Sequence, residues 1–184
     1  MKWQWDDNAI KSKLATDNVA TMLVNKMKRF GNSSQDILKV AAVLGAKFRT
    51  SMVATVIDNV PQKELRRLSS AETEELTSES TDVSTLNSSV HEFEEEGLLE
   101  KESEEDDVWN FVHDQVQSAA IQLIPLDKQD NFRGEIGTVL MEQLDPDVLD
   151  DSLFAVVSLC NYSIDDLDTK DERKELAAMN LRQA

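Results

Sequence analysis

A histidine and an aspartate stand side by side at a point where the sequence changes its periodicity. Trp109 and Phe111 alternate as in a half-buried strand, and from Val116 onward the apolar residues recur at helical spacing. His113 and Asp114 lie at this switch. An aspartate there can cap the first helical turn, and a histidine beside the positive end of a helix is placed to contact an anion such as phosphate. Two interpretations are therefore open, a phosphate sensor and a purely structural cap.

The other residues with reactive side chains have simpler explanations. His91 is surrounded by glutamates and lacks a second ligand at metal-binding spacing, so we expect a solvated side chain and no metal site. Cys160 lies on an apolar helical stripe, which predicts a packed and unreactive thiol. The pairs Asp106-Asp107 and Asp150-Asp151 have the chemistry for acid–base catalysis, but solvated turns and helix N-termini account for them. The sequence thus predicts no catalytic residues, and we expect that this chain is not an enzyme.

Composition narrows the possible partners. The 184 residues carry a net charge of −17, from 36 acidic and 19 basic side chains. Nucleic acids and anionic membranes both require positive charge, so neither is an expected partner. No apolar run approaches the length of a transmembrane helix, and a single cysteine fits a reducing compartment, so we expect a cytoplasmic protein. The sequence carries no signal for an oligomeric state.

Amphipathic helical patterns dominate the chain and predict a mainly α fold. Gly31 and Asn32 end an early helix, Ser33 and Asp36 stand at capping-box spacing at the start of the next, and Pro61 ends a third. The segments with helical periodicity are 6–14, 19–30, 33–44, 52–60, 83–97, 116–123, 132–144, 153–167 and 169–181.

Residues 62–82 interrupt this pattern. Serine, threonine and glutamate dominate there and large apolar residues are few, which predicts a solvated, disordered insertion with room for a helical turn at 63–68. Phosphorylation of this segment is conceivable, although a plain surface insertion is the more economical interpretation.

Two short apolar segments, 98–99 and 108–112, are expected to form a β-hairpin around an acidic turn. Three helices followed by a hairpin is the order of a winged helix, so we expect a winged-helix-like domain at 33–124. It would follow N-terminal helices at 1–32. Residues 125–184 are expected to form antiparallel helices that resemble the start of a helical-repeat array. Because the final helical pattern has no C-cap, it indicates a segment truncated from something longer.

Several stretches, in order along the chain, resemble one family. They are Trp5-Asp6, Thr16-Asp17-Asn18-Val19, the run from Gln35 to Phe48 (QDILKVAAVLGAKF), Glu96-Gly97-Leu98-Leu99, the run from Phe111 to Ala120 (FVHDQVQSAA), Leu123-Ile124-Pro125 and the run from Leu176 to Leu181 (LAAMNL). They resemble the region C-terminal to the nucleotide-binding core in large AAA-type signalling ATPases of the STAND class. Those proteins are often fused to serine/threonine kinase, GAF and histidine kinase or cyclase domains.

The resemblance implies a regulatory role without the ATPase site itself. The phosphate-binding loop of such cores ends in Gly-Lys-Ser/Thr, and no such run occurs here; the sequence from Leu44 to Phe48 lacks the first glycine and the hydroxyl ligand for magnesium. No cofactor is therefore expected in this chain, and ATP or ADP would bind to the core of a longer parent protein. Residues 1–32 would link from that absent core.

In the family, a His-Asp pair in the winged helix contacts the nucleotide's β-phosphate. The resemblance implies that His113 would donate to phosphate and that Asp114 would fix the turn. This sequence departs from the family at Gln115, where the family has arginine.

Winged helices often bind DNA, but the predicted recognition helix, 82–97, has four glutamates near its end and no lysine or arginine. The wing, 100–107, has one lysine against six acidic residues, so contact with phosphates would be repulsive. We therefore expect a non-catalytic module that relays the state of an ATPase core and contacts that core and other protein domains. The alternative is a free-standing helical interaction adaptor with no nucleotide link.

Overall fold

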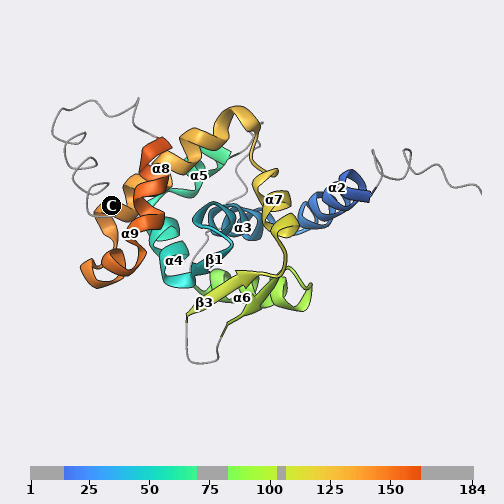
Figure 1. Cartoon of the computed structure of the whole chain (residues 1–184), viewed down its shortest axis with the longest axis horizontal. Coiled ribbons are helices and arrows are strands. Elements are labelled where there is room, and N and C mark those ends of the chain that lie inside the picture. The colour runs from blue at the N-terminus through green and yellow to red at the C-terminus, as the bar shows by residue number, and fades with distance from the viewer. Residues whose placement is uncertain (1–14, 70–82, 103–106, 163–184) are drawn as a thin grey trace, which may run out of the picture.

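The computed structural model describes residues 15–69, 83–102 and 107–162, which form a mainly helical molecule with one small antiparallel sheet (Figure 1). The expected helices at 6–14 and 169–181 lie outside the described residues. The helices are α2 (Ala15–Met27), α3 (Asn32–Leu44), α4 (Thr50–Asn59), α5 (Gln62–Ser69), α6 (Val83–Glu95), α7 (Asp114–Ile121), the short 3-10 helix η1 (Leu126–Lys128), α8 (Gln129–Gln143) and α9 (Pro146–Cys160). The strands are β1 (Lys47–Arg49), β2 (Leu99–Lys101) and β3 (Val108–Phe111).

Helix α3 is the central element of the fold. Every residue from Asp36 to Leu44 is buried, and α3 contacts α4, α5, α6, α7, α9 and β1. Its start differs from the prediction, because the N-cap is Gly31 and no side chain caps the helix. Ser33 and Asp36 are buried in the interior and do not form the expected capping box, since Asp36 accepts from buried cations instead of a backbone N–H.

The predicted hairpin is present and is extended by a third strand. Strand β3 lies between β1 and β2, and both pairings are antiparallel. Phe48 of β1 stands opposite Trp109, and Leu99 of β2 stands opposite Phe111. Gly97, at φ 67°, turns the chain from α6 into β2 in the left-handed region that glycine favours.

The helical turn expected at 63–68 is present and is longer than predicted, because residues 62–69 form helix α5; the expectation of a disordered insertion is wrong for these eight residues. The Pro61 carbonyl accepts from the backbone N–H of Glu64 and of Leu65, which closes the first turn. Leu65 and Leu68 are buried, and α5 contacts α3 and α8. Two leucines three residues apart therefore supply enough apolar surface to dock a short polar helix. The remainder of the predicted insertion, 70–82, lies outside the described residues.

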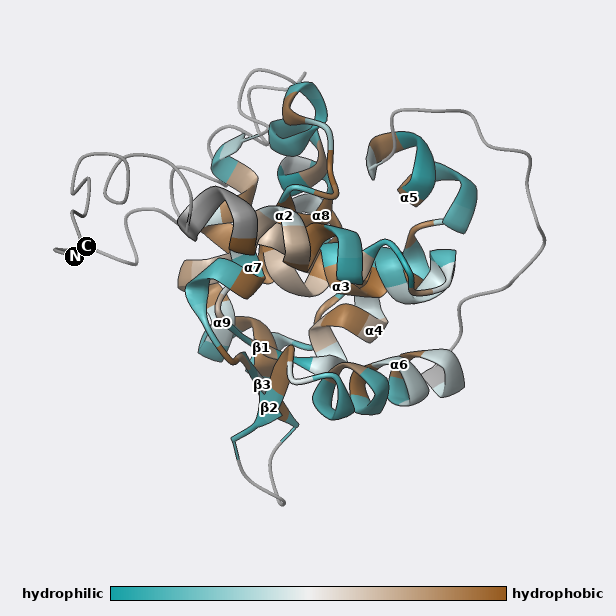
Figure 2. Cartoon of the chain, turned by 90° about the vertical axis from the view of Figure 1, so that its right-hand side faces the viewer, coloured by the Kyte–Doolittle hydropathy of each residue, from teal (hydrophilic) through white to brown (hydrophobic). Residues whose placement is uncertain are grey.

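Helices α8 and α9 pack against each other and close one continuous core that runs from Met27 to Cys160. Their backbones approach most closely at Gly137, where a side chain would meet the backbone of Leu159 and Cys160. In Figure 2, apolar residues gather on α3, α4 and β3, whereas β2, α5 and α6 are largely polar. None of the helices in the described ranges has both the length and the apolar character needed to cross a bilayer.

Candidate functional site

The predicted site lies at the corner where β3 turns into α7. Backbone hydrogen bonds fix this corner on two sides: Phe111 N donates to the Ala46 carbonyl at 2.8 Å, and Val112 N donates to the Leu98 carbonyl at 3.2 Å. Because both neighbouring segments hold the end of β3, the position of His113 is set by the sheet.

His113, and not Asp114, is the N-cap of α7. Its backbone is extended (φ −155°, ψ 148°), and its Nδ1 accepts a hydrogen bond from Gln115 N at 3.1 Å. The prediction that Asp114 caps the turn is therefore wrong by one residue, because the extended conformation that a cap requires falls on His113. Asp114 is the first residue of the helix, where its carboxylate interacts favourably with the helix dipole.

Helix α7 holds this corner rigidly against the core. Val116, Ala119 and Ala120 are buried, as the helical stripe predicted, and α7 packs against α2 and α3. The Gln117 side chain adds a hydrogen bond from Nε2 to the Ala42 carbonyl of α3, at 2.8 Å. The side chains of His113 and Asp114 remain exposed at the surface.

The cap decides which ring nitrogen of His113 can bind another group. A neutral histidine whose Nδ1 accepts a hydrogen bond carries its proton on Nε2. With Nδ1 engaged in the cap, Nε2 is the nitrogen of this exposed imidazole that is left to bind a partner, at the positive end of a helix. This arrangement suits a hydrogen bond to an anionic oxygen supplied by another domain.

The structure describes two other reactive side chains singled out in the sequence, a buried Cys160 thiol and an exposed His91 imidazole. Cys160 is 2% exposed, and burial raises the pKa of its thiol to about 11, so the thiol is protonated at neutral pH. His91 is exposed, lies 3.5 Å from a Glu94 carboxylate oxygen and stands edge-on to Trp109. Within residues 15–69, 83–102 and 107–162, no group of three or more His, Cys, Asp or Glu side chains could hold a metal ion.

The acidic pairs also act as structural groups where they are described. Asp107 Oδ2 accepts from Ser51 N at 2.8 Å, and its backbone carbonyl accepts from Thr50 N, so this residue caps the start of α4. Asp151 lies 3.8 Å from Arg49 in an exposed ion pair. Asp106 lies outside the described residues.

Sequence analysis missed a buried charged cluster between α3 and α5. Lys39 Nζ donates to Asp36 Oδ1 at 3.1 Å and to Ser69 Oγ at 3.2 Å, while Arg66 Nε donates to Asp36 Oδ2 at 3.3 Å. The two ends of this cluster are about thirty positions apart in the chain, so no local pattern predicts it. Charged residues are rarely buried unless they are paired, and pairing of this kind depends on the tertiary fold.

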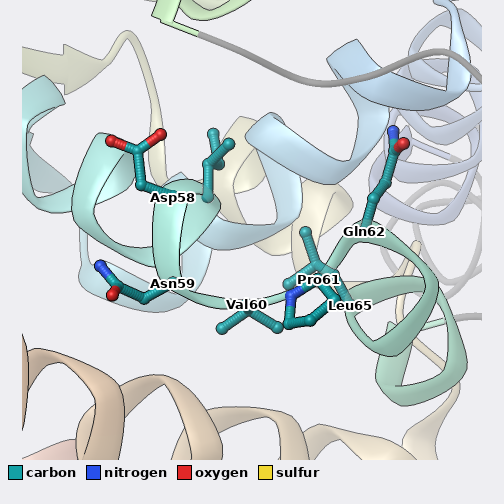
Figure 3. Close-up of a pocket in the computed structure, with 7 residues that line it drawn as sticks. Asp58, Asn59, Val60, Pro61, Gln62 and Leu65 are labelled. Atoms are coloured by element: carbon teal, nitrogen blue, oxygen red, sulfur yellow. The ribbon is translucent and has the colours of Figure 1, made fainter.

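Two hollows in the described surface lack the features of a ligand site. One, of about 310 Å³, lies at the turn between α4 and α5, and Figure 3 shows that its polar side chains, Asp58, Asn59 and Gln62, point in different directions. The other, of about 440 Å³, lies between β1 and α9 and has an ion pair on its rim, Arg49 with Asp151. A specific ligand site needs polar groups that converge on one point, and neither hollow provides this convergence.

Comparison with known proteins finds similarity to a short segment of one signalling protein. The chain is 23% identical over 215 residues to "Hybrid signal transduction histidine kinase G" of Dictyostelium discoideum, an alignment that covers 97% of this chain and 6% of that protein. The chain thus spans a small fraction of the length of this relative. No protein-family model matches the chain, and no solved structure matches it.

Proposed function

We propose that this chain is a non-catalytic regulatory segment of an AAA/STAND-type signal-transduction ATPase, in which it couples the nucleotide state of a core domain to partner or effector domains. The observation that carries the proposal is the exposed imidazole of His113, which is held at the start of α7 because its Nδ1 caps the helix. A core domain packed over this corner would bring its bound nucleotide to the imidazole.

The order of the elements supports the winged-helix part of this proposal. Helix α3, strand β1, helices α4 and α6, and the β2–β3 hairpin follow one another as in a winged helix, with α5 added before α6. The similarity to a segment of a signal transduction histidine kinase is consistent with a place in a large signalling protein.

The charge of α6 favours protein partners over nucleic acid. The four glutamates at and after its C-terminal end, Glu92, Glu94, Glu95 and Glu96, are all exposed. They would repel a phosphate backbone, whereas a basic surface on another protein domain would be compatible with them.

The test is nucleotide binding measured by calorimetry, on this chain alone and on the chain preceded by the nucleotide-binding core that we expect its gene to encode upstream. We expect no ATP binding by the isolated chain and tight ADP binding by the longer protein. Micromolar ATP affinity in the isolated chain would contradict the proposal. The absence of an upstream sequence that encodes a core would also contradict it, and would favour a free-standing adaptor.

Two variants separate a phosphate sensor from a plain cap. His113→Asn keeps a side-chain oxygen that can cap α7 but removes the imidazole N–H, whereas His113→Ala removes both. If His113 contacts phosphate, both variants of the longer protein should lose about 1.5–3 kcal/mol of ADP binding, roughly tenfold to a hundredfold in affinity. If the affinity for ADP is unchanged in His113→Asn, His113 is not a phosphate sensor and only caps α7.

A further inference from the structure

Helix α5 ends in a sequence that carries the charge pattern of a kinase substrate. Arg66 and Arg67 stand three and two residues before Ser69, the last residue of the helix. Basophilic serine kinases select acceptor serines by arginines at these two positions, and such charge patterns are a general means of kinase–substrate specificity. The structure, however, places Ser69 at 0% exposure.

Among the described residues, the buried cluster that holds Ser69 has more positive than negative charge. It contains two cations, Lys39 and Arg66, and one anion, Asp36, whose side chain is 3% exposed. Arg66 Nη2 is buried and has no hydrogen-bond partner within the described part of the chain. A buried donor without a partner reduces the stability of the contact that buries it, so Arg66 Nη2 opposes the docking that Leu65, Leu68 and the hydrogen bonds to α5 favour.

Docked α5 conceals the residues that a kinase must recognise. Arg66 is largely buried against Asp36, and Ser69 is fully buried, whereas Arg67 is exposed and pairs with Glu64. Recognition therefore requires α5 to leave the surface formed by α3 and α8. A helix of eight residues is not stable in isolation, so a detached α5 would present its arginines and serine as a flexible peptide.

We propose that Ser69 is a phosphorylation site for a basophilic serine kinase, and that its modification holds α5 away from α3 and α8. In the reaction the kinase supplies ATP and a general base. A bond forms between Ser69 Oγ and the γ-phosphorus, the bond from that phosphorus to the β–γ bridging oxygen breaks, ADP leaves, and the base takes the hydroxyl proton.

The phosphorylated side chain does not fit its former position. Phosphate adds a charge of about −1.5 to −2 at a site that has no exposed surface. Lys39 Nζ donates to Ser69 Oγ, but it also donates to Asp36, whose carboxylate would repel the new dianion. The single excess positive charge of the cluster cannot neutralise it, so re-docking would bury unpaired charge. Phosphorylation therefore exposes Leu65, Leu68 and the surface that they cover.

The test uses the full chain with Ser70→Ala, so that phosphate on the RRLS sequence can be assigned to one serine. The catalytic subunit of cyclic-AMP-dependent protein kinase and Mg·ATP provide the modification, and a synthetic peptide of residues 62–75 with the same substitution serves as the freely accessible substrate. Mass spectrometry locates the phosphate, and hydrogen exchange of the modified chain reports on α5. We expect phosphate on Ser69 and fast exchange of α5 amides, with α3 and α9 still protected.

A matched pair of leucine variants tests whether modification follows local opening. Leu65→Ala weakens the docking of α5 and should raise the rate of Ser69 phosphorylation about tenfold or more, because the open population grows. Leu99→Ala removes an equally buried leucine from β2, so it should raise the rate much less.

Four results would overturn the proposal. In the first two, the kinase modifies the peptide but not the chain, or it modifies neither. In the third, Ser69 is phosphorylated but the α5 amides stay as protected as before. In the fourth, both leucine variants accelerate phosphorylation equally, which would mean that modification follows global unfolding.

Discussion

Gly137 offers the sharpest test of the packing between α8 and α9. A Cβ atom at this position would lie 2.6 Å from Cys160 N, 2.8 Å from the Leu159 carbonyl carbon and 2.9 Å from Leu159 Cβ. These are atoms of the helix backbone and its first side-chain carbon, so no rotamer change can move them aside. Gly137→Ala therefore forces α8 and α9 apart.

The expected cost follows from two opposing effects. Overpacking a well-packed contact costs about 1–3 kcal/mol, and the fixed backbone places this substitution near the upper end of that range. The higher helix propensity of alanine relative to glycine raises the free energy of unfolding by about 1 kcal/mol. The free energy of unfolding should therefore fall by about 2 kcal/mol, which lowers Tm by roughly 4–8 °C in a domain of this size.

The assay is thermal and urea unfolding of the full chain followed by circular dichroism, with Gly31→Ala as the control. Gly31 has φ −59°, and a Cβ there would meet nothing within 4 Å. Loss of a glycine N-cap and the reduced entropy of the unfolded chain oppose each other in this control, so its stability should stay within about 1 kcal/mol of wild type. A Gly137→Ala chain as stable as Gly31→Ala would refute the close contact.

Three further measurements test other parts of the fold. Because burial raises the pKa of Cys160 to about 11, the folded chain should resist iodoacetamide in mildly alkaline buffer and react readily in guanidinium chloride; fast reaction of the folded chain would contradict the burial. His113→Ala should lower the free energy of unfolding by about 1 kcal/mol and His113→Asn should restore most of it, as read from urea midpoints, unless the cap at Gln115 is absent in solution. The hydrogen bond from Lys26 holds the pKa of Glu96 below its ordinary value, so this contact stabilises the fold above the ordinary pKa of glutamate and is lost as pH falls through the lower, folded pKa. The difference in urea midpoint between wild type and Lys26→Met should accordingly shrink on acidification, and a difference that stays constant with pH would argue against the contact.

The sequence predicted a helix correctly where a long apolar stripe indicates which face of the helix is buried. The expected segments 33–44, 52–60 and 83–97 correspond to α3, α4 and α6, and the expected strand at 108–112 corresponds to β3. Each has several apolar residues at one period, so the local sequence specifies the element and its face.

Strand β1 could not be predicted in this way, and of helix α5 only a turn at 63–68 was expected, because contacts with distant segments define both elements. Strand β1 has three residues, too few for an alternating pattern, and is a strand only because β3 lies beside it. Helix α5 has only two buried leucines among polar and charged residues, so its composition resembles that of a solvated loop. Asp36 appeared to belong to a capping box, since nothing near it in sequence indicates that Arg66 packs against it.

The corner between strand and helix could be located from the sequence, but its capping residue could not. The change from strand to helix periodicity placed the corner at 113–114, and the structure has it there. Which of the two residues caps the helix depends on where the backbone is last extended, and hydrogen bonds from Phe111 and Val112 to segments distant in sequence set this point. A one-residue difference in that register decides whether the cap is a carboxylate or an imidazole, and only an imidazole leaves a second nitrogen to bind a partner.

Both proposals depend on the same central helix. Helix α3 holds the His113 corner through the hydrogen bond from Gln117 to Ala42, and it holds α5 through Asp36 and Lys39. Helix α3 also packs against α4, α6, α7, α9 and β1, and these contacts anchor it when α5 is released. Release of α5 should therefore change which surface is exposed and leave the corner in place. A nucleotide contact at His113 and a phosphate at Ser69 would then act as two separate inputs, each read by a different partner surface of one rigid module.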